Sequence, residues 1–272
     1  MKLSDNKFAL ITGGAGLLGS YHAEALAEEG FNVILVDINL KKLNNIKQKL
    51  KKKYRKRKFL IFNCDIRYTE KVEQLKNNIK EKDIFVSCLI NNAEKNPKMM
   101  EKKTFTKINA IENYDHKKIL NEIEVGILGT FNCCKVFGLE MAKKKYGSIV
   151  NISSDLGINA PDQRVYQKNE KINLVMNFKP IGYSISKHAI SGITKYFSTY
   201  WANKNVRFNT LALGAVLNNQ PKYLINNVKK RIPLNRWAKR NEYKQAIKFL
   251  ASEENSYMTG QTLIIDGGRT IW

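Results

Sequence analysis

The stretch that decides the fold is residues 8–19, which read FALITGGAGLLG. A short apolar run ends in a glycine cluster, and a segment with helical periodicity, residues 18–29, follows at once. Glycines at these positions let the backbone turn tightly and approach a phosphate group, whose charge then faces the positive end of the helix. A second apolar run, residues 33–37, ends in an acid, Asp37. Strand, glycine loop, helix and acidic strand end together predict a dinucleotide-binding βαβ unit.

The same alternation of short apolar runs and longer amphipathic segments continues along the chain. It predicts strands at 8–12, 33–37, 59–63, 84–91, 148–152, 206–211 and 262–265, and helices at 18–29, 40–53, 69–81, 119–145, 183–203 and 241–252. The strands are too apolar to have a solvent-exposed face, which indicates a parallel sheet with helices on both sides. We therefore expect a single α/β domain over residues 1–272, a Rossmann-type doubly wound sheet of about seven strands. Two stretches, 94–113 and 155–182, have no clear period, and such long loops tend to be functional.

Composition excludes several classes of protein. The 272 residues are 43% hydrophobic, which is too apolar for a disordered chain. No apolar run approaches the ~18 residues that span a bilayer, and four cysteines without C-x-x-C spacing suggest buried free thiols rather than a metal site. We expect a cytoplasmic protein with no membrane partner and no metal.

The net charge of +23 comes from 47 basic against 24 acidic residues. Its dense block, residues 41–58, contains eleven basic side chains interleaved at helical spacing with apolar ones. This pattern is typical of an amphipathic helix with a solvated basic face. No stacking aromatics interleave the charges as a single-strand platform would require, so a nucleic-acid partner is not expected despite the charge.

A second motif carries the chemistry. Tyr183 and Lys187 lie one helical turn apart, and the strand before their helix ends in Ser154. An ammonium group close to a phenol favours the phenolate, so we expect Lys187 to lower the pKa of Tyr183. Ser154 delivers a hydroxyl to the carboxyl edge of the sheet, where open α/β folds bind ligands.

Together these residues resemble the short-chain dehydrogenase/reductase family over essentially the whole chain. The resemblance also uses Asp65 after the third strand, the run 91–93 (NNA) after the fourth and the ending 257–268 (YMTGQTLIIDGG). It implies that Tyr183 is the general acid in carbonyl reduction and the base in alcohol oxidation. Ser154 would hydrogen-bond the reacting oxygen, and Lys187 would hold the nicotinamide ribose. The implied cofactor-binding set is Thr12, Gly13, Gly16, Leu18, Gly19, Asp37, Asp65, Ile66, Asn91, Ala93, Lys187 and Gly214.

The cofactor is expected to be NAD(H) rather than NADP(H). An aspartate at the position of Asp37 accepts hydrogen bonds from both adenosine ribose hydroxyls and repels a 2′-phosphate. Nearby Lys41 and Lys42 weaken this expectation, because an ammonium group can compensate that phosphate.

The chain departs from the family pattern at four places. The glycine spacing matches the family's extended sugar-nucleotide branch, although the chain ends too early for that branch's substrate domain. Gly126 occupies the place of the usual relay asparagine, which puts the proton relay in doubt. Glu94 replaces a usual glycine and Leu213 a usual proline, both beside the expected nicotinamide pocket.

The insertion 155–182 suggests the substrate. Its polar side chains suit a sugar, and Gln163, Arg164 and Tyr166 are the candidate substrate residues, with Arg164 or Lys168 able to meet a phosphate or carboxylate. The alternative interpretation is that the insertion is a solvent-exposed surface loop that does not bind substrate. The loop also resembles the branch associated with nonulosonic (legionaminic-type) acid and flagellin-glycan biosynthesis, which implies a polar, sugar-derived substrate.

Two other functions remain open from the sequence. One is reduction of 3-oxoacyl groups on an acidic carrier protein, which the basic surface would favour. The other is a catalytically impaired Rossmann scaffold with a nucleic-acid-binding or regulatory role. The long helices that begin near residues 119 and 183 resemble those of family interfaces, which implies a homodimer or homotetramer.

Overall fold

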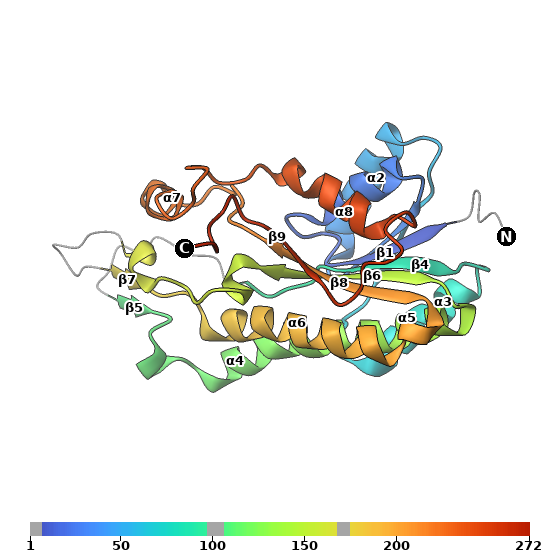
Figure 1. Ribbon diagram of the computed structural model, residues 1–272, viewed down its shortest axis with the longest axis horizontal. Helices are drawn as coiled ribbons and strands as arrows, with labels where there is room; N and C mark the ends of the chain where they lie inside the picture. Colours follow the sequence, from blue (N-terminus) through green and yellow to red (C-terminus); the bar gives the residue numbers. More distant parts are fainter. Residues whose placement is uncertain (1–6, 97–105, 168–174) are drawn as a thin grey trace.

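The computed structural model describes residues 7–96, 106–167 and 175–272. A seven-stranded sheet runs through it in the order β3-β2-β1-β4-β6-β8-β9, with every neighbouring pair parallel (Figure 1). Its strands are β1 (Phe8–Thr12), β2 (Asn32–Asp37), β3 (Phe59–Asn63), β4 (Val86–Asn91), β6 (Gly147–Ser154), β8 (Val206–Leu213) and β9 (Thr262–Ile265). The predicted doubly wound Rossmann-type sheet is confirmed.

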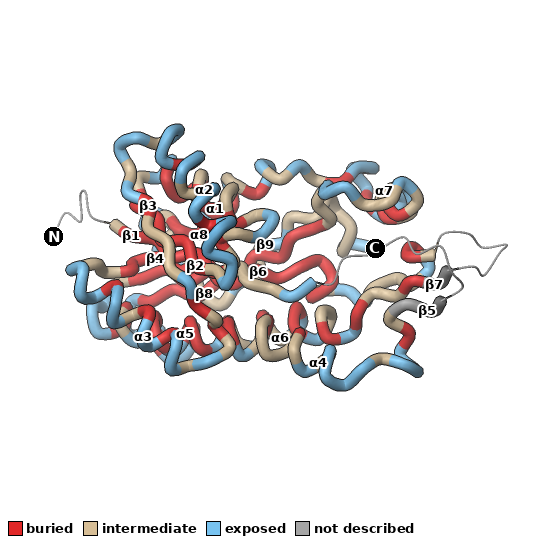
Figure 2. The backbone as a smooth tube through the Cα atoms, turned by 180° about the vertical axis from the view of Figure 1, so that it is seen from behind, coloured by how far each residue is buried: buried red, intermediate tan, exposed pale blue. Residues whose placement is uncertain are grey.

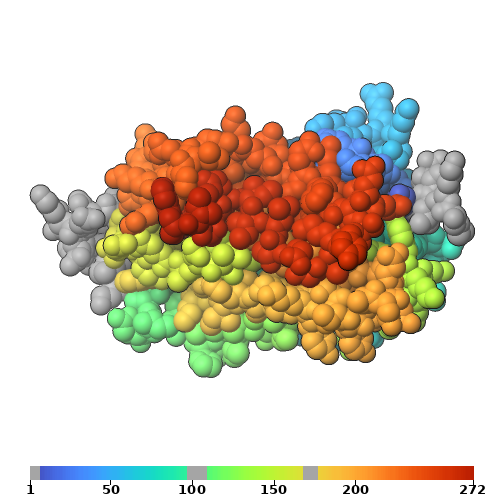
Figure 3. All heavy atoms as spheres, viewed as in Figure 1, coloured from blue at the N-terminus to red at the C-terminus, as the bar shows by residue number. Residues whose placement is uncertain are grey.

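Helices cover both faces of this sheet (Figure 1). One layer contains α1 (Gly19–Glu28), α2 (Leu40–Lys53) and α8 (Lys244–Ala251). The other contains α3 (Thr69–Lys80), α5 (Gly129–Lys144) and α6 (Ile181–Tyr200), with α4 (His116–Ile123) packed against α6. The last segments of the chain, from α8 to the C-terminus, spread over much of the face seen in Figure 3.

The central strands are buried on both faces. In β1, Ala9 and Ile11 belong to the core under α1 and α8, whereas Phe8 and Leu10 belong to the core over α3 and α5. All four side chains are 1% exposed or less. Figure 2 shows the same concentration of buried residues along the strands. Burying each of the larger side chains stabilises the fold by about 1.5–3 kcal/mol.

The helix predicted at 119–145 is longer and interrupted. It runs from His116 to Lys144 as α4, a π-helical turn at Glu124–Leu128, and α5. By length and composition alone this run could cross a membrane, but 61% of its most apolar window is buried within the protein. That burial is what a core helix of a globular protein shows.

The two aperiodic stretches pair with each other. β5 (Thr106–Ile108) and β7 (Val175–Asn177) form a separate two-stranded parallel sheet (Figure 1). Beside it, α7 (Lys222–Lys229) packs Leu224 and Val228 against Val165 and Tyr166 of the insertion 155–182. Neither the small sheet nor α7 was predicted from the sequence.

Two smaller predictions are confirmed. Helix α2 buries Leu43 and Leu50, while most of its lysines are exposed, so the basic block is a solvated helix face. The four cysteines, Cys64, Cys88, Cys133 and Cys134, are buried free thiols.

Candidate active site at the carboxyl edge of the sheet

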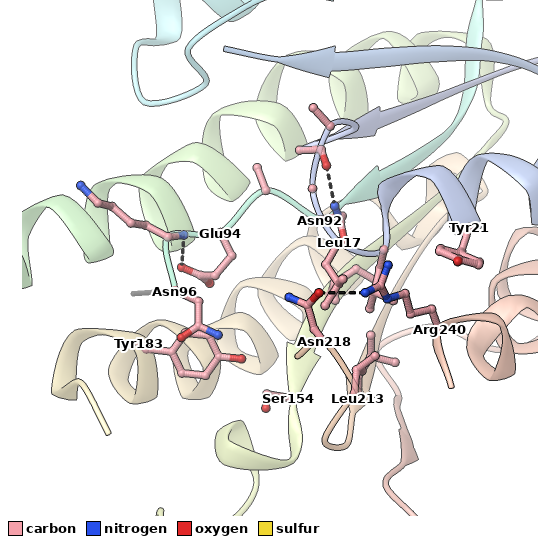
Figure 4. A pocket seen from close by; sticks show the side chains of 18 of the residues that line it. Leu17, Tyr21, Asn92, Glu94, Asn96, Ser154, Tyr183, Leu213, Asn218 and Arg240 are labelled. Carbon is pink, nitrogen blue, oxygen red and sulfur yellow. Dashed lines mark hydrogen bonds between the residues drawn. The ribbon is translucent and has the colours of Figure 1, made fainter. Parts of the chain in front are cut away.

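A cavity of about 1450 Å³ lies where the parallel strands end. Residues after β1, β2, β4, β6 and β8 line it, together with the start of α6 (Figure 4). A cavity of this size at this edge is the usual ligand site of an open α/β sheet.

The glycine loop forms one wall. Gly13 has a left-handed backbone (φ +62°), and a Cβ there would lie 2.7 Å from the Cα of Ala93. A Cβ on Gly19, the first residue of α1, would lie 2.6 Å from the carbonyl oxygen of Gly14. The loop can therefore adopt this tight path only because glycines stand at positions 13 and 19. The positive N-terminal end of α1 follows directly. These features fit a dinucleotide pyrophosphate.

Two acids mark the far end of this wall. The Asp37 carboxylate accepts hydrogen bonds from the backbone N–H groups of Ala15 (3.0 Å) and Asn39 (2.9 Å), which fixes it beside the loop. Asp65 is held by the Arg67 guanidinium, and this bond lowers the pKa of the Asp65 carboxyl. Asp37, Asp65 and Ile66 all line the cavity, as a site for the adenosine half of the cofactor requires.

Three residues of the predicted cofactor set do not line the cavity: Thr12, Gly19 and Asn91. The Thr12 hydroxyl accepts hydrogen bonds from the backbone N–H groups of Asn92 and Ala93, both at 3.1 Å, and so joins the ends of β1 and β4. The Asn91 side chain points into the sheet, where it donates to Asn151 at 2.8 Å. The other members, Gly13, Gly16, Leu18, Asp37, Asp65, Ile66, Ala93, Lys187 and Gly214, lie on its surface.

The predicted catalytic residues meet at the opposite wall. Tyr183 is in the first turn of α6, and Ser154 is the last residue of β6; Figure 4 shows the phenol pointing toward the serine. The ammonium of Lys187 lies 5.7 Å from the centre of the Tyr183 ring. It donates to the carbonyl oxygen of Ile152 (3.0 Å) and forms an ion pair with Glu94 (2.8 Å).

The expectation that Lys187 lowers the pKa of Tyr183 is wrong for this arrangement. Burial raises the pKa of the Tyr183 phenol, the charges of Glu94 and Asp155 raise it further, and only the hydrogen bond with Ser154 opposes them. Burial is the largest cause, so the nearby lysine does not bring the pKa of the phenol below its ordinary value. The phenol is therefore protonated at neutral pH.

Ser154 belongs to a charged chain that the sequence did not reveal. Its hydroxyl donates to the Asp155 carboxylate at 2.7 Å, and Asp155 is paired with Arg269 at 2.5 Å. Arg269 comes from the segment after β9, 114 residues further along the chain. The pair fixes the serine at the bottom of the cavity and brings the C-terminal segment to the site.

The insertion contributes differently from the prediction. Tyr166 is buried and lines the cavity, but Arg164 lies on the surface with its guanidinium bonded to Asp162, and its side chain is 75% exposed. Gln163 accepts a hydrogen bond from the backbone N–H of Lys179 and lies outside the cavity lining. Lys168 lies outside the described residues.

Lys179, rather than Arg164, is the basic side chain that lies beside Tyr183 in the cavity. Its ammonium lies 3.7 Å from the centre of the Tyr183 ring and donates to the side-chain oxygen of Asn96 at 2.8 Å. Burial lowers the pKa of Lys179 from 10.5 to about 8. Lys179 lies only four residues before Tyr183, so its closeness could have been noticed in the sequence. It was not predicted as a site residue because it lies before the helix that carries Tyr183.

Comparison with known proteins identifies similar chains over nearly the whole length. A family described as enoyl-(acyl carrier protein) reductase matches residues 15–270. A 3-oxoacyl-[acyl-carrier-protein] reductase of Thermotoga maritima is 29% identical, covering 98% of this chain and 99% of the relative. The post-translational flagellin modification protein A of Campylobacter coli is 26% identical, covering 97% and 98%. The structure of a short chain dehydrogenase from Leptospira borgpetersenii with bound NAD+ is 26% identical and superposes with a TM-score of 0.81, covering 98% and 93%.

The glycine loop yields the first prediction. Gly19→Ala places a methyl group against two backbone carbonyl oxygens, so the loop must shift, and we expect NADH affinity to fall by about tenfold or more. Fluorescence titration with NADH measures this. The matched control is Asn77→Ala, an exposed side chain on α3 outside the cavity lining. It should leave NADH affinity unchanged. Equal affinity in the two variants would contradict the assignment of the loop.

Proposed function

Because the chain belongs to the short-chain dehydrogenase/reductase family, we propose that Tyr183, Ser154 and Lys187 catalyse hydride exchange between NAD(H) and a polar, sugar-derived substrate. Family membership makes the protein an oxidoreductase that acts on CH–OH groups with a nicotinamide cofactor. The observation that carries the proposal is the convergence of these three side chains in the cavity that the glycine loop also lines.

The chemistry divides between cofactor and protein. When bound, the nicotinamide gives or takes the hydride. In carbonyl reduction the Tyr183 phenol donates its proton to the substrate oxygen, while Ser154 hydrogen-bonds that oxygen. The positive charge of Lys187 stabilises the phenolate that remains.

The raised pKa of Tyr183 gives the two directions different pH dependences. Reduction needs the protonated phenol, which is fully present at neutral pH. Alcohol oxidation needs the phenolate, whose fraction grows with each unit of pH below the raised pKa.

The polar groups around Tyr183 support a sugar-derived substrate. Asp155, Arg269, Asn96, Lys179 and Tyr166 surround Tyr183 with hydrogen-bonding groups. The relative named for flagellin modification agrees with the branch expected from the sequence. Reduction of 3-oxoacyl groups on a carrier protein is the second candidate, favoured by the Thermotoga maritima relative and the charge of +23. A screen of sugar phosphates, nucleotide sugars and acyl-carrier substrates, followed by NADH absorbance, separates the two.

We also propose a homodimer or homotetramer in the cytoplasm. Exposed apolar side chains follow one another on α5 and α6, among them Phe131, Leu139, Tyr196 and Tyr200. Such faces suit a closed, symmetric helix interface. Four buried free thiols are compatible with a reducing compartment.

Removing the catalytic proton donor tests the reaction. Tyr183→Phe deletes only the phenolic oxygen, so we expect turnover to fall by about 10²- to 10⁴-fold. NADH affinity should stay nearly unchanged, because the ring and Lys187 remain. Steady-state rates and NADH titration on the same preparation check both expectations. Near-normal turnover in this variant would refute the proposed mechanism.

Cofactor preference tests the role of Asp37. The parent protein should bind NADH more tightly than NADPH. Asp37→Asn keeps an acceptor beside Ala15 but removes the charge that repels a 2′-phosphate, so the preference should fall by about tenfold or more. Glu70→Gln, a charge removal on α3 outside the cavity lining, serves as the control. Tighter binding of NADPH by the parent protein would overturn the NAD(H) assignment.

A further inference from the structure

Lys187 is held by an acid that stands directly after the run 91–93. Its ammonium lies 2.8 Å from Glu94 Oε2 and 3.0 Å from the carbonyl oxygen of Ile152. The side chains of the pair are 5% and 10% exposed. Two charges so well shielded from water need each other, because removing either one leaves the other buried without compensation.

Gly126 explains how this carboxylate reaches the lysine. The glycine is buried in the π-helical turn between α4 and α5. A Cβ at position 126 would lie 2.9 Å from both carboxylate oxygens of Glu94 and 2.8 Å from Cβ of Ser186. The space that a side chain at 126 would occupy is therefore filled by the Glu94 carboxylate.

We propose that Glu94 and Gly126 form a complementary pair in which Glu94 is the positioning residue for Lys187, held in a space that only glycine at 126 leaves open. The proposal rests on the function proposed above and extends it. Glu94 fixes where the ammonium lies relative to Tyr183 and sets how much of its charge the phenol experiences. In this way Glu94 biases Tyr183 toward the protonated form that donates to a carbonyl.

Several other ionisable groups face Tyr183 and must be kept constant in any test. They are Lys187 on α6, Lys179 before it, Asp155 after β6, Tyr166 in the insertion, Glu122 on α4 and Arg269 after β9. Only Glu94 combines direct contact with Lys187 and proximity to Gly126.

The test measures the ionisation of position 183 without turnover. A fluorinated tyrosine placed at 183, with a phenol that ionises near neutral pH, is titrated by ¹⁹F NMR. Glu94→Gln keeps the shape and removes the charge, so the midpoint should fall by about half a pH unit or more. Glu94→Asp, which keeps the charge, should recover part of the shift. Glu81→Gln, an exposed acid at the end of α3, is the control and should change nothing.

Gly126→Ala tests the complementarity. The new methyl group must displace the carboxylate, so the midpoint should fall in the Glu94 protein and remain unchanged in the Glu94→Gln background. An unaltered midpoint in Glu94→Gln refutes the positioning role. If Gly126→Ala changes the midpoint equally in both backgrounds, the Glu94 carboxylate does not depend on the space that Gly126 leaves open, and this part of the proposal is refuted. Because no substrate is used, either failure is distinct from a failure of Tyr183→Phe to lose activity.

A different observation carries a second inference. Of the cations around Tyr183, Lys187 is paired with Glu94 and Arg269 with Asp155. Lys179 has the neutral Asn96 as its partner, and no carboxylate of the described residues lies within ion-pair distance of it. The carboxylates of Asp155, Glu94 and Glu122 are near enough to raise its pKa, but among the described residues this half-buried ammonium has no direct ion pair.

We infer that Lys179 binds an anionic group of the substrate, a carboxylate or phosphate attached close to the reacting carbon. A bound anion would give this ammonium a direct charged partner through a charge-assisted hydrogen bond. Burial lowers the pKa of Lys179 to about 8, so this binding should weaken as pH rises through 8. Asp155, Glu94 and Glu122 oppose the loss of charge, and Lys187 promotes it.

Binding of small anions tests the inference directly. Tartrate, gluconate and inorganic phosphate are titrated calorimetrically into the NADH-loaded protein, with sorbitol as the neutral partner of gluconate. Lys179→Met keeps a side chain of similar length but removes its charge. It should weaken the binding of the anions by about tenfold or more while leaving the affinity for sorbitol unchanged. Lys82→Met, an exposed lysine just after α3 and outside the cavity lining, is the control. If no anion binds the parent protein more tightly than Lys179→Met, the inference is wrong; whether carboxylate or phosphate binds better identifies the group.

Discussion

Burial of a parallel sheet on both faces is the constraint on which the rest of the molecule depends. Polar groups are expensive inside such strands, and all parallel strands end at the same edge, so the chain's functional side chains gather there. The Thr12 hydroxyl illustrates how tightly this edge is built, since it joins the ends of β1 and β4 through two backbone N–H groups. The glycine loop and the Ser154 hydroxyl then face one cavity, although they are about 140 residues apart.

Charge balance inside that cavity decides its proton chemistry. A lysine near a phenol would ordinarily promote ionisation, but in this protein the lysine is also paired with a buried acid. Ser154 is similarly coupled to an Asp155–Arg269 pair. Tyr183 therefore lies among groups whose charges largely cancel, and burial dominates its pKa. Among the described residues Lys179 has no direct ion pair, so its ammonium is free to form one with an anionic ligand.

The parts of the structure that the sequence could predict are those set by local pattern. Strands β1, β3 and β9 have the predicted bounds, because apolar runs ending in turn residues define them locally. The pairing of β5 with β7 joins residues 69 positions apart and leaves no periodic signal in either segment. Tyr183 and Lys187 were predicted from their spacing and Ser154 from its place at a strand end, whereas Arg269 and Lys179 reach the site through the path of the chain. The pKa of Tyr183 depends on a contact between α6 and the loop after β4, which no local pattern encodes.

Positions 94 and 126 show why departures from a family pattern are better interpreted in space than along the chain. Taken singly, a glutamate for a glycine and a glycine for an asparagine both suggest an impaired site. Taken together, they exchange a side chain between two elements that face the same lysine, so the volume stays filled while a neutral amide becomes a carboxylate. A carboxylate attracts the ammonium more strongly than an amide does and also opposes ionisation of the nearby phenol. The exchange therefore preserves the position of Lys187 and shifts the acid–base balance of Tyr183 toward proton donation.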